Sequence, residues 1–164
     1  MRKYILGIPI DWFDKDEALR RIAQYIKTGT PHQIVTVNAE FVVLGQEDSR
    51  FRAALTDSAL AVADGTGIIL AQQLNDTQDN RSYFIRTLQY LILGIEYMIM
   101  PHTFHYQRIT GVNLAEWIME TGEQKDWKIY LLGAAPGIAK QAAKVWQERY
   151  SNLKIVGASA DNPD

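Results

Sequence analysis

Short runs of branched apolar residues alternate along the chain with longer segments whose apolar residues recur every three or four positions. Short apolar runs are typical of buried strands, and a spacing of three or four is typical of helices that pack one face on a sheet. The strand-like runs are YILGIPI, HQIVTVNAE, ALAVADG, WKIYLLG and LKIVGAS. This alternation predicts an α/β fold: a Rossmann-like, largely parallel sheet with helices on both faces.

The first two helical segments have recognisable limits. Residues 13–29 offer Asp14 as the N-cap, Glu17 at the capping-box position and Gly29 as the terminator. Residues 41–55 predict further helix with a break near Asp48. No repeat or linker is visible, so we expect a single domain over residues 1–164, with an apolar helical insertion at about 76–106.

The insertion contains the most apolar segment, residues 83–100, which approaches the length of a membrane span. Arg86, Gln89 and Glu96 interrupt it and fall on one side of a helix. We therefore expect a helix that lies against protein or in a membrane surface, not one that spans. Contact with the membrane or a lipid, packing on the core and a subunit interface all remain open from the sequence.

Composition narrows the class of protein. The chain has 164 residues and no cysteine, which excludes thiol nucleophiles and thiolate metal sites and fits a reducing compartment. The N-terminus lacks the apolar core of a signal peptide, so we expect a cytoplasmic protein. A net charge of -2 and no basic tract argue against a nucleic-acid partner.

Three predicted strands end in polar or glycine-rich residues. In open parallel sheets, ligands bind beyond the carboxyl ends of the strands. We therefore expect one crevice lined by residues 36–40 (TVNAE), 64–67 (DGTG) and 133–137 (GAAPG).

Each of the first two strand ends also has a simpler interpretation. Asp64 is placed to act as a general base or to orient a sugar hydroxyl. Asp-Gly is equally a common turn pair, and Gly67 would then serve helix entry. Thr36 and Asn38 offer directed donors and acceptors to a polar ligand, but they also suit the cap of the following helix.

Two further elements suggest anion binding. The turn from Gly133 through Pro136 to Gly137 lets backbone amides approach an anion at a helix start. It matches neither the Walker nor the Rossmann glycine pattern, and 65–67 fails the latter because Leu70 is too large, so a nicotinamide enzyme has little support. Arg108 precedes another helix start and suits a diphosphate, although a surface arginine is the commoner role.

His102 and His105 are three residues apart, between aromatic residues and after a proline. Without cysteines or an HExxH pattern, they fit packing or surface positions better than a zinc site. We expect no metal centre.

The order of these motifs is more specific than any one of them. ILGIPID, IVTVNAEFVVLGQEDSRFRAAL, ALAVADGTGI, QRITGVNL, IYLLGAAPGIAKQAA and YSNLKIVGAS together resemble the WecG/TagA/CpsF glycosyltransferase family over nearly the whole chain. The resemblance implies an inverting transferase that moves a hexosamine-type or related sugar from a UDP donor to a polyprenyl-diphosphate-linked sugar. Such enzymes act at the inner face of the cell membrane in teichoic acid or exopolysaccharide synthesis, with no metal or other cofactor.

The resemblance also assigns roles. Asp64 would be the base that deprotonates the acceptor hydroxyl, and Thr36 and Asn38 would line the pocket and orient the substrates. Arg108 would stabilise the diphosphate. The glycines that follow Asp64, Gly65 and Gly67, would admit substrate, and the turn at 133–137 would approach the nucleotide.

This sequence departs from the family pattern in three places. Gln107 stands where an acid usually precedes the arginine, and the segment between Gly67 and Arg108 is longer and more apolar than usual. The family also continues past GASADNPD into a βα stretch with a Pro-Lys-Gln-Glu motif and a basic appendage used for membrane contact. The alternative to an active transferase is therefore a catalytically impaired module that binds a nucleotide sugar or lipid. A homo-oligomer is also compatible with the sequence.

Overall fold

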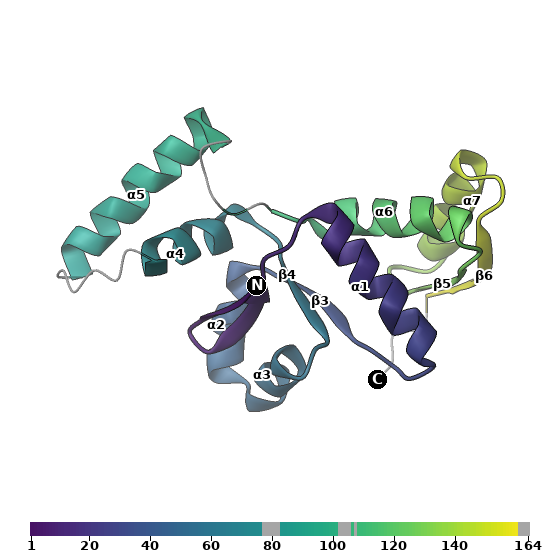
Figure 1. Ribbon diagram of the computed structural model, residues 1–164, viewed down its shortest axis with the longest axis horizontal. Helices are drawn as coiled ribbons and strands as arrows, with labels where there is room; N and C mark the ends of the chain where they lie inside the picture. The colour runs from purple at the N-terminus through teal and green to yellow at the C-terminus, as the bar shows by residue number, and fades with distance from the viewer. Residues whose placement is uncertain (77–82, 102–105, 107, 161–164) are drawn as a thin grey trace. The chain divides into compact units, whose positions relative to one another are not determined.

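The computed structural model describes residues 1–76, 83–101, 106 and 108–160. The chain divides into two compact units, Met1–Gly111 and Val112–Asp164, and each is described by itself (Figure 1). The elements of the first unit are β1 (Arg2–Ile5), β2 (Ile8–Asp11), α1 (Lys15–Thr28), β3 (Ile34–Val37), α2 (Ala39–Glu47), α3 (Ser49–Thr56), β4 (Leu60–Ala63), α4 (Thr66–Asp76) and α5 (Tyr83–Ile99). The single domain that the sequence predicts over residues 1–164 stays a prediction.

A four-stranded sheet organises the first unit, in the order β1-β2-β4-β3. Strands β2, β4 and β3 are parallel, and β1 joins the edge antiparallel to β2. In the β3–β4 ladder Val37 pairs with Ala63. The next residues of both strands, Asn38 and Asp64, therefore emerge at the same edge of the sheet, as the sequence predicted.

The N-terminal strand prediction was wrong in one respect. Residues 4–10 form not one strand but parts of two, because the chain reverses at Leu6 and Gly7. Both residues have positive φ, 48° and 79°, which is the backbone of the two-residue turn that favours glycine in hairpins. The branched apolar residues on either side of the turn disguised it as a continuous strand.

The core of the first unit lies around β2 and β4, whose residues are all buried. Apolar side chains from the sheet meet those of α2, α3 and α4 in one cluster: Ile5, Ile8, Ile10, Val37, Val42, Leu55, Ala61, Ala63 and Ile68. Removal of such surface from water is the main stabilising term of the unit. This packing holds the carboxyl ends of β3 and β4 in place.

Asp11, at the end of β2, is a buried charge that joins three parts of the sheet. Its side chain is 4% exposed and accepts two hydrogen bonds from Arg2, at 2.8 Å from Nε and 2.6 Å from Nη2. The backbone N–H of Ala61 in β4 donates to the same carboxylate at 2.9 Å. Since Asp11 and Val62 are the one pair in the β2–β4 register, this carboxylate extends the contact between the two strands.

The helix limits predicted from the sequence are confirmed at α1 and at the break after α2. Asp14 caps α1 by accepting from the Glu17 N–H at 2.8 Å, and Gly29 ends it in the left-handed conformation. Asp48 separates α2 from α3 and caps α3 through the Arg50 and Phe51 amides. These caps are local interactions, which explains why the sequence predicted them.

Helix α5 lies alongside α4 (Figure 1). Leu93 and Tyr97 pack against Ile69 and Leu70, and Gly94 faces Leu70. The other side of α5 is an exposed apolar stripe, here called the α5 stripe: Ile85, Leu88, Leu91, Ile92, Ile95, Met98 and Ile99, each at least 40% exposed. Within the described ranges, no helix combines the length and apolar character needed to cross a membrane.

The second unit contains most of α6 (Gly111–Gln124), then β5 (Lys128–Leu132), α7 (Ile138–Arg149) and β6 (Lys154–Ser159). Strands β5 and β6 form a parallel pair, and α7 connects them. Gly122 of α6 allows close packing, since an added Cβ would lie 3.1 Å from Ile129 and 3.5 Å from Leu153. Both units are therefore α/β with mostly parallel strands, which confirms the predicted fold class.

Candidate active site

The ends of β3 and β4 bring Thr36, Asn38 and Asp64 close together. A Cβ built on Gly111, at the start of α6, would lie 3.5 Å from Asp64 Oδ2 and 3.6 Å from Thr36 Oγ1. A Cβ on Gly65 would lie 3.9 Å from Asn38 Cβ. Thr36 and Asp64 therefore both lie beside the Cα of Gly111, and Asn38 lies beside Gly65, the residue after Asp64.

Asp64 has one carboxylate oxygen held and the other open. Its backbone N–H donates to Val37 O at 2.8 Å, which ties β4 to the end of β3. Its Oδ2 accepts from the Gly111 N–H at 3.0 Å. Over the described ranges Oδ1 has no hydrogen-bond partner, and the side chain is half-buried. A carboxylate fixed through one oxygen can present the other to a substrate proton.

Gly111 reaches Asp64 because residues 108–111 return beside the end of β4. The Ile109 N–H donates to Ala63 O at 3.0 Å, and the Ile109 side chain is buried. Arg108, just before it, is exposed and has no ion-pair partner in the described part of the chain. The return segment thus carries a cation to the edge where Asp64 ends its strand.

A polar network anchors the start of that return segment. The ammonium of Lys3 donates to both oxygens of Asp76, at 2.7 and 2.8 Å, and to the hydroxyl of Tyr106, which in turn donates to Asp76. Burial raises the pKa of Asp76, but hydrogen bonds from Lys3, Tyr106 and Gln72 outweigh it and leave the pKa below its ordinary value. Trp12 packs on the Tyr106 ring, with centroids 4.3 Å apart.

Asn38 is the N-cap of α2, which is the structural one of the two roles that the sequence allowed. Its Oδ1 accepts from the Phe41 N–H at 2.8 Å and caps α2. The amide NH₂ and the Thr36 hydroxyl have no hydrogen-bond partner in the part of the molecule described. Asn38 therefore caps a helix and still has two donors open toward Asp64's edge of the sheet.

Gly65 and Gly67 lie between Asp64 and the body of α4. Gly65 has a φ of 119°, a conformation that favours glycine. A Cβ on Gly67 would come within 3.3 Å of Ala39 Cβ and 3.5 Å of Tyr90 Oη, so glycine lets α2, α4 and α5 approach. Sequence reasoning did not predict the hydroxyl of Tyr90 beside Gly67 or the amide of Gly111 beside Asp64. Their contacts join residues 23 and 47 positions apart.

The glycine turn predicted to bind the nucleotide lies in the second unit. Gly133, Ala134 and Gly137 all have positive φ, and Gly137 is the N-cap residue of α7, where no side chain caps the helix. Pro136 and Gly137 are exposed, and an added Cβ at Gly133 or Gly137 would meet nothing within 4 Å. The turn thus presents accessible backbone, and its convergence with Asp64 stays a prediction.

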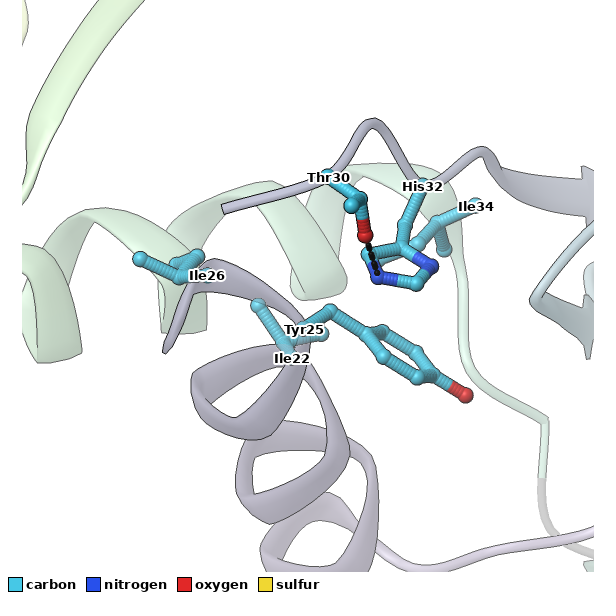
Figure 2. A pocket seen from close by; sticks show the side chains of 6 residues that line it. All are labelled: Ile22, Tyr25, Ile26, Thr30, His32 and Ile34. Carbon is cyan, nitrogen blue, oxygen red and sulfur yellow. Dashed lines mark hydrogen bonds between the residues drawn. The ribbon is translucent and has the colours of Figure 1, made fainter. Parts of the chain in front are cut away.

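A hollow of about 150 Å³ lies at the opposite end of β3 from Thr36 and Asn38. Its lining is shown in Figure 2: Ile22, Tyr25, Ile26, Thr30, His32 and Ile34. Tyr25 and His32 stack with centroids 4.6 Å apart, and Thr30 hydrogen-bonds His32 at 3.2 Å. None of the predicted site residues lines it.

The described residues contain no group of three or more histidine or acidic side chains that can hold a metal ion. The expectations about His102, His105 and Gln107 concern residues outside the described ranges.

Comparison with known families adds an independent observation. The profile of the glycosyl transferase WecG/TagA/CpsF family matches residues 3–93 and 89–163. The chain belongs to this family. The WecG/TagA/CpsF family consists of glycosyltransferases of cell-surface polysaccharide synthesis, which makes the protein a transferase by family. The two matches meet within α5, inside the segment described above as an apolar insertion.

Proposed function

We propose that the protein is an inverting glycosyltransferase that moves a hexosamine-type sugar from a UDP donor to a polyprenyl-diphosphate-linked sugar. The observation that carries the proposal is the carboxylate of Asp64, held through Oδ2 by the Gly111 amide with Oδ1 open. Family membership supports the reaction class. The donor and the acceptor come from the resemblance described in the sequence analysis.

In this proposal Asp64 takes the proton of the acceptor hydroxyl. The acceptor oxygen then forms a bond to the anomeric carbon from the face opposite the leaving group. The bond between that carbon and the UDP oxygen breaks, and UDP leaves with the electron pair. A positioned carboxylate base and stabilised leaving-group charge each contribute large rate factors to such a displacement.

The other residues have supporting roles. Thr36 and the amide NH₂ of Asn38 orient substrate hydroxyls, since both are open donors beside Asp64. Arg108 stabilises a diphosphate through its guanidinium, which is exposed at the same edge. The turn at 133–137 approaches the nucleotide through its backbone amides. Its positive φ angles and the open space around Gly133 and Gly137 suit a backbone that binds an anion.

We also propose that the protein acts at the inner face of the cell membrane and that the α5 stripe touches the membrane surface. Seven exposed apolar side chains follow one side of a 17-residue helix. An amphipathic helix of this kind binds in the interface plane through its apolar face. A subunit interface would use the same surface.

Liposome flotation distinguishes these two uses of the stripe. Replacing Ile92 and Ile95 by Ser should abolish flotation, whereas Val43→Ser, at an equally exposed apolar position on α2, should not. If the double variant floats like the wild type, the membrane proposal fails. If it instead changes an oligomer into a monomer on gel filtration, the stripe is a subunit interface.

The direct test of the reaction is a panel of UDP-sugars incubated with the protein and a short-chain polyprenyl-diphosphate-GlcNAc. The proposal predicts UDP release that depends on both the donor and the acceptor. Calorimetric binding of UDP without release on any member of the panel would instead favour the impaired binding module.

A further inference from the structure

Tyr90 of α5 has its hydroxyl at the start of α4, the helix that follows the candidate base along the chain. A Cβ on Gly67 would lie 3.5 Å from Tyr90 Oη and 3.3 Å from Ala39 Cβ. Gly67 follows Asp64 by three residues, and Ala39 directly follows Asn38. The phenol therefore lies at the ends of the two strands that carry the candidate site.

This hydroxyl is open to a ligand. Tyr90 is 37% exposed, and Oη has no hydrogen-bond partner within the described segments. Tyrosine hydroxyls normally find a partner when they are buried, and they can both donate and accept. A phenol that is exposed at the rim of a polar site can do either for a bound substrate.

Tyr90 lies on the side of α5 that faces α4, and the α5 stripe follows the other side of the helix. Leu91, the next residue, is 59% exposed, and Met98, two turns further on, is 84% exposed. One helix thus offers a hydroxyl toward the candidate site and apolar side chains along its other side. A UDP-sugar is polar throughout, whereas a polyprenyl-linked acceptor joins a polar head to an apolar chain. The combination on α5 matches the acceptor.

We propose that Tyr90 is a further substrate-binding residue, which hydrogen-bonds the polar head of the lipid-linked acceptor. This inference rests on the proposed function, because it takes the acceptor class from it. It adds a role for α5 at the site: the helix contributes acceptor recognition next to the base, while donor recognition belongs to other residues.

The test is Tyr90→Phe, which removes only the hydroxyl. Loss of one neutral hydrogen bond predicts a rise of about three- to tenfold in the KM for the short-chain polyprenyl-diphosphate-GlcNAc. The KM for the UDP-sugar should stay within about twofold. Tyr97→Phe is the matched control, since it removes a hydroxyl two turns along the same helix where the ring packs on Ile69 and Leu70, and both constants should stay at the wild-type values.

An unchanged acceptor KM in Tyr90→Phe, or a rise confined to the UDP-sugar, would overturn the inference. If the wild type releases no UDP, the proposed reaction fails separately, and calorimetric titration with the same acceptor still tests Tyr90. In that titration the inference predicts weaker binding by the variant. Equal binding, or no binding by the wild type, would overturn it.

Discussion

Replacing Asp11 by Ala should destabilise the first unit substantially. The substitution leaves the Ala61 N–H in β4 buried without its 2.9 Å acceptor, which costs about 1–3 kcal/mol. The substitution also removes the ion pair with Arg2. Because the Arg2 side chain is 34% exposed, water screens the pair, and its loss costs about 1 kcal/mol of the free energy of unfolding. The expected loss in the free energy of unfolding is therefore about 2–4 kcal/mol.

Urea unfolding followed by circular dichroism measures this loss. With a urea dependence of about 2 kcal/mol per molar, the midpoint should fall by about 1–2 M. Asp11→Asn should lose less, because its side-chain oxygen can still accept from Ala61. Glu17→Gln is the control: Glu17 pairs with Arg20 and Arg21 at the surface, and its midpoint should not move measurably. A midpoint for Asp11→Ala equal to that of the wild type would refute the argument that this carboxylate joins β2 to β4.

Two further predictions concern the site and its anchor. Gly111→Ala places a methyl group 3.5 Å from Asp64 Oδ2 and 3.6 Å from Thr36 Oγ1, the two side chains to which the proposal gives substrate contacts. The value of kcat/KM for transfer should therefore fall at least about tenfold with an unchanged unfolding midpoint, and full activity would contradict this placement of the substrate. The pKa of Asp76 is lower in the folded protein than its ordinary value. The ionised Asp76 side chain therefore stabilises the fold at pH values above the ordinary pKa, and this stabilisation is lost as the pH falls through the lowered pKa. The urea unfolding midpoint of Asp76→Asn should therefore decrease less than that of the wild type when the pH falls below about 4. Equal decreases in the two proteins would contradict the network with Lys3 and Tyr106.

Local interactions explain what the sequence could predict of the fold. The cap at Asp14, the end at Gly29 and the break at Asp48 each involve groups within a few residues of one another, so the pattern of residue types identifies them. The reversal at Leu6 and Gly7 was missed because the apolar residues beside it resemble a continuous strand. Burial of β2 and of Ile5 at the end of β1, and not local propensity, decides that arrangement.

The candidate site could be predicted in part from the order of the strands and helices along the chain. The parallel arrangement of β3 and β4 follows from the order of elements, so the shared edge of Asn38 and Asp64 was predictable. The Gly111 amide and the Tyr90 hydroxyl come from segments that return to the site after long excursions. Their positions depend on tertiary packing, for which a single sequence carries no periodic signal.

The measurement that tests the central claim most directly compares sugar transfer by the wild type and Asp64→Asn. The asparagine oxygen can still accept from the Gly111 amide, so the unfolding midpoint and UDP affinity should stay close to those of the wild type. The carboxamide cannot take a proton, and loss of a general base predicts a fall of about 10²–10⁴-fold in kcat with saturating donor and acceptor. Transfer by a folded Asp64→Asn protein at the wild-type rate would contradict the assignment of Asp64 as the base.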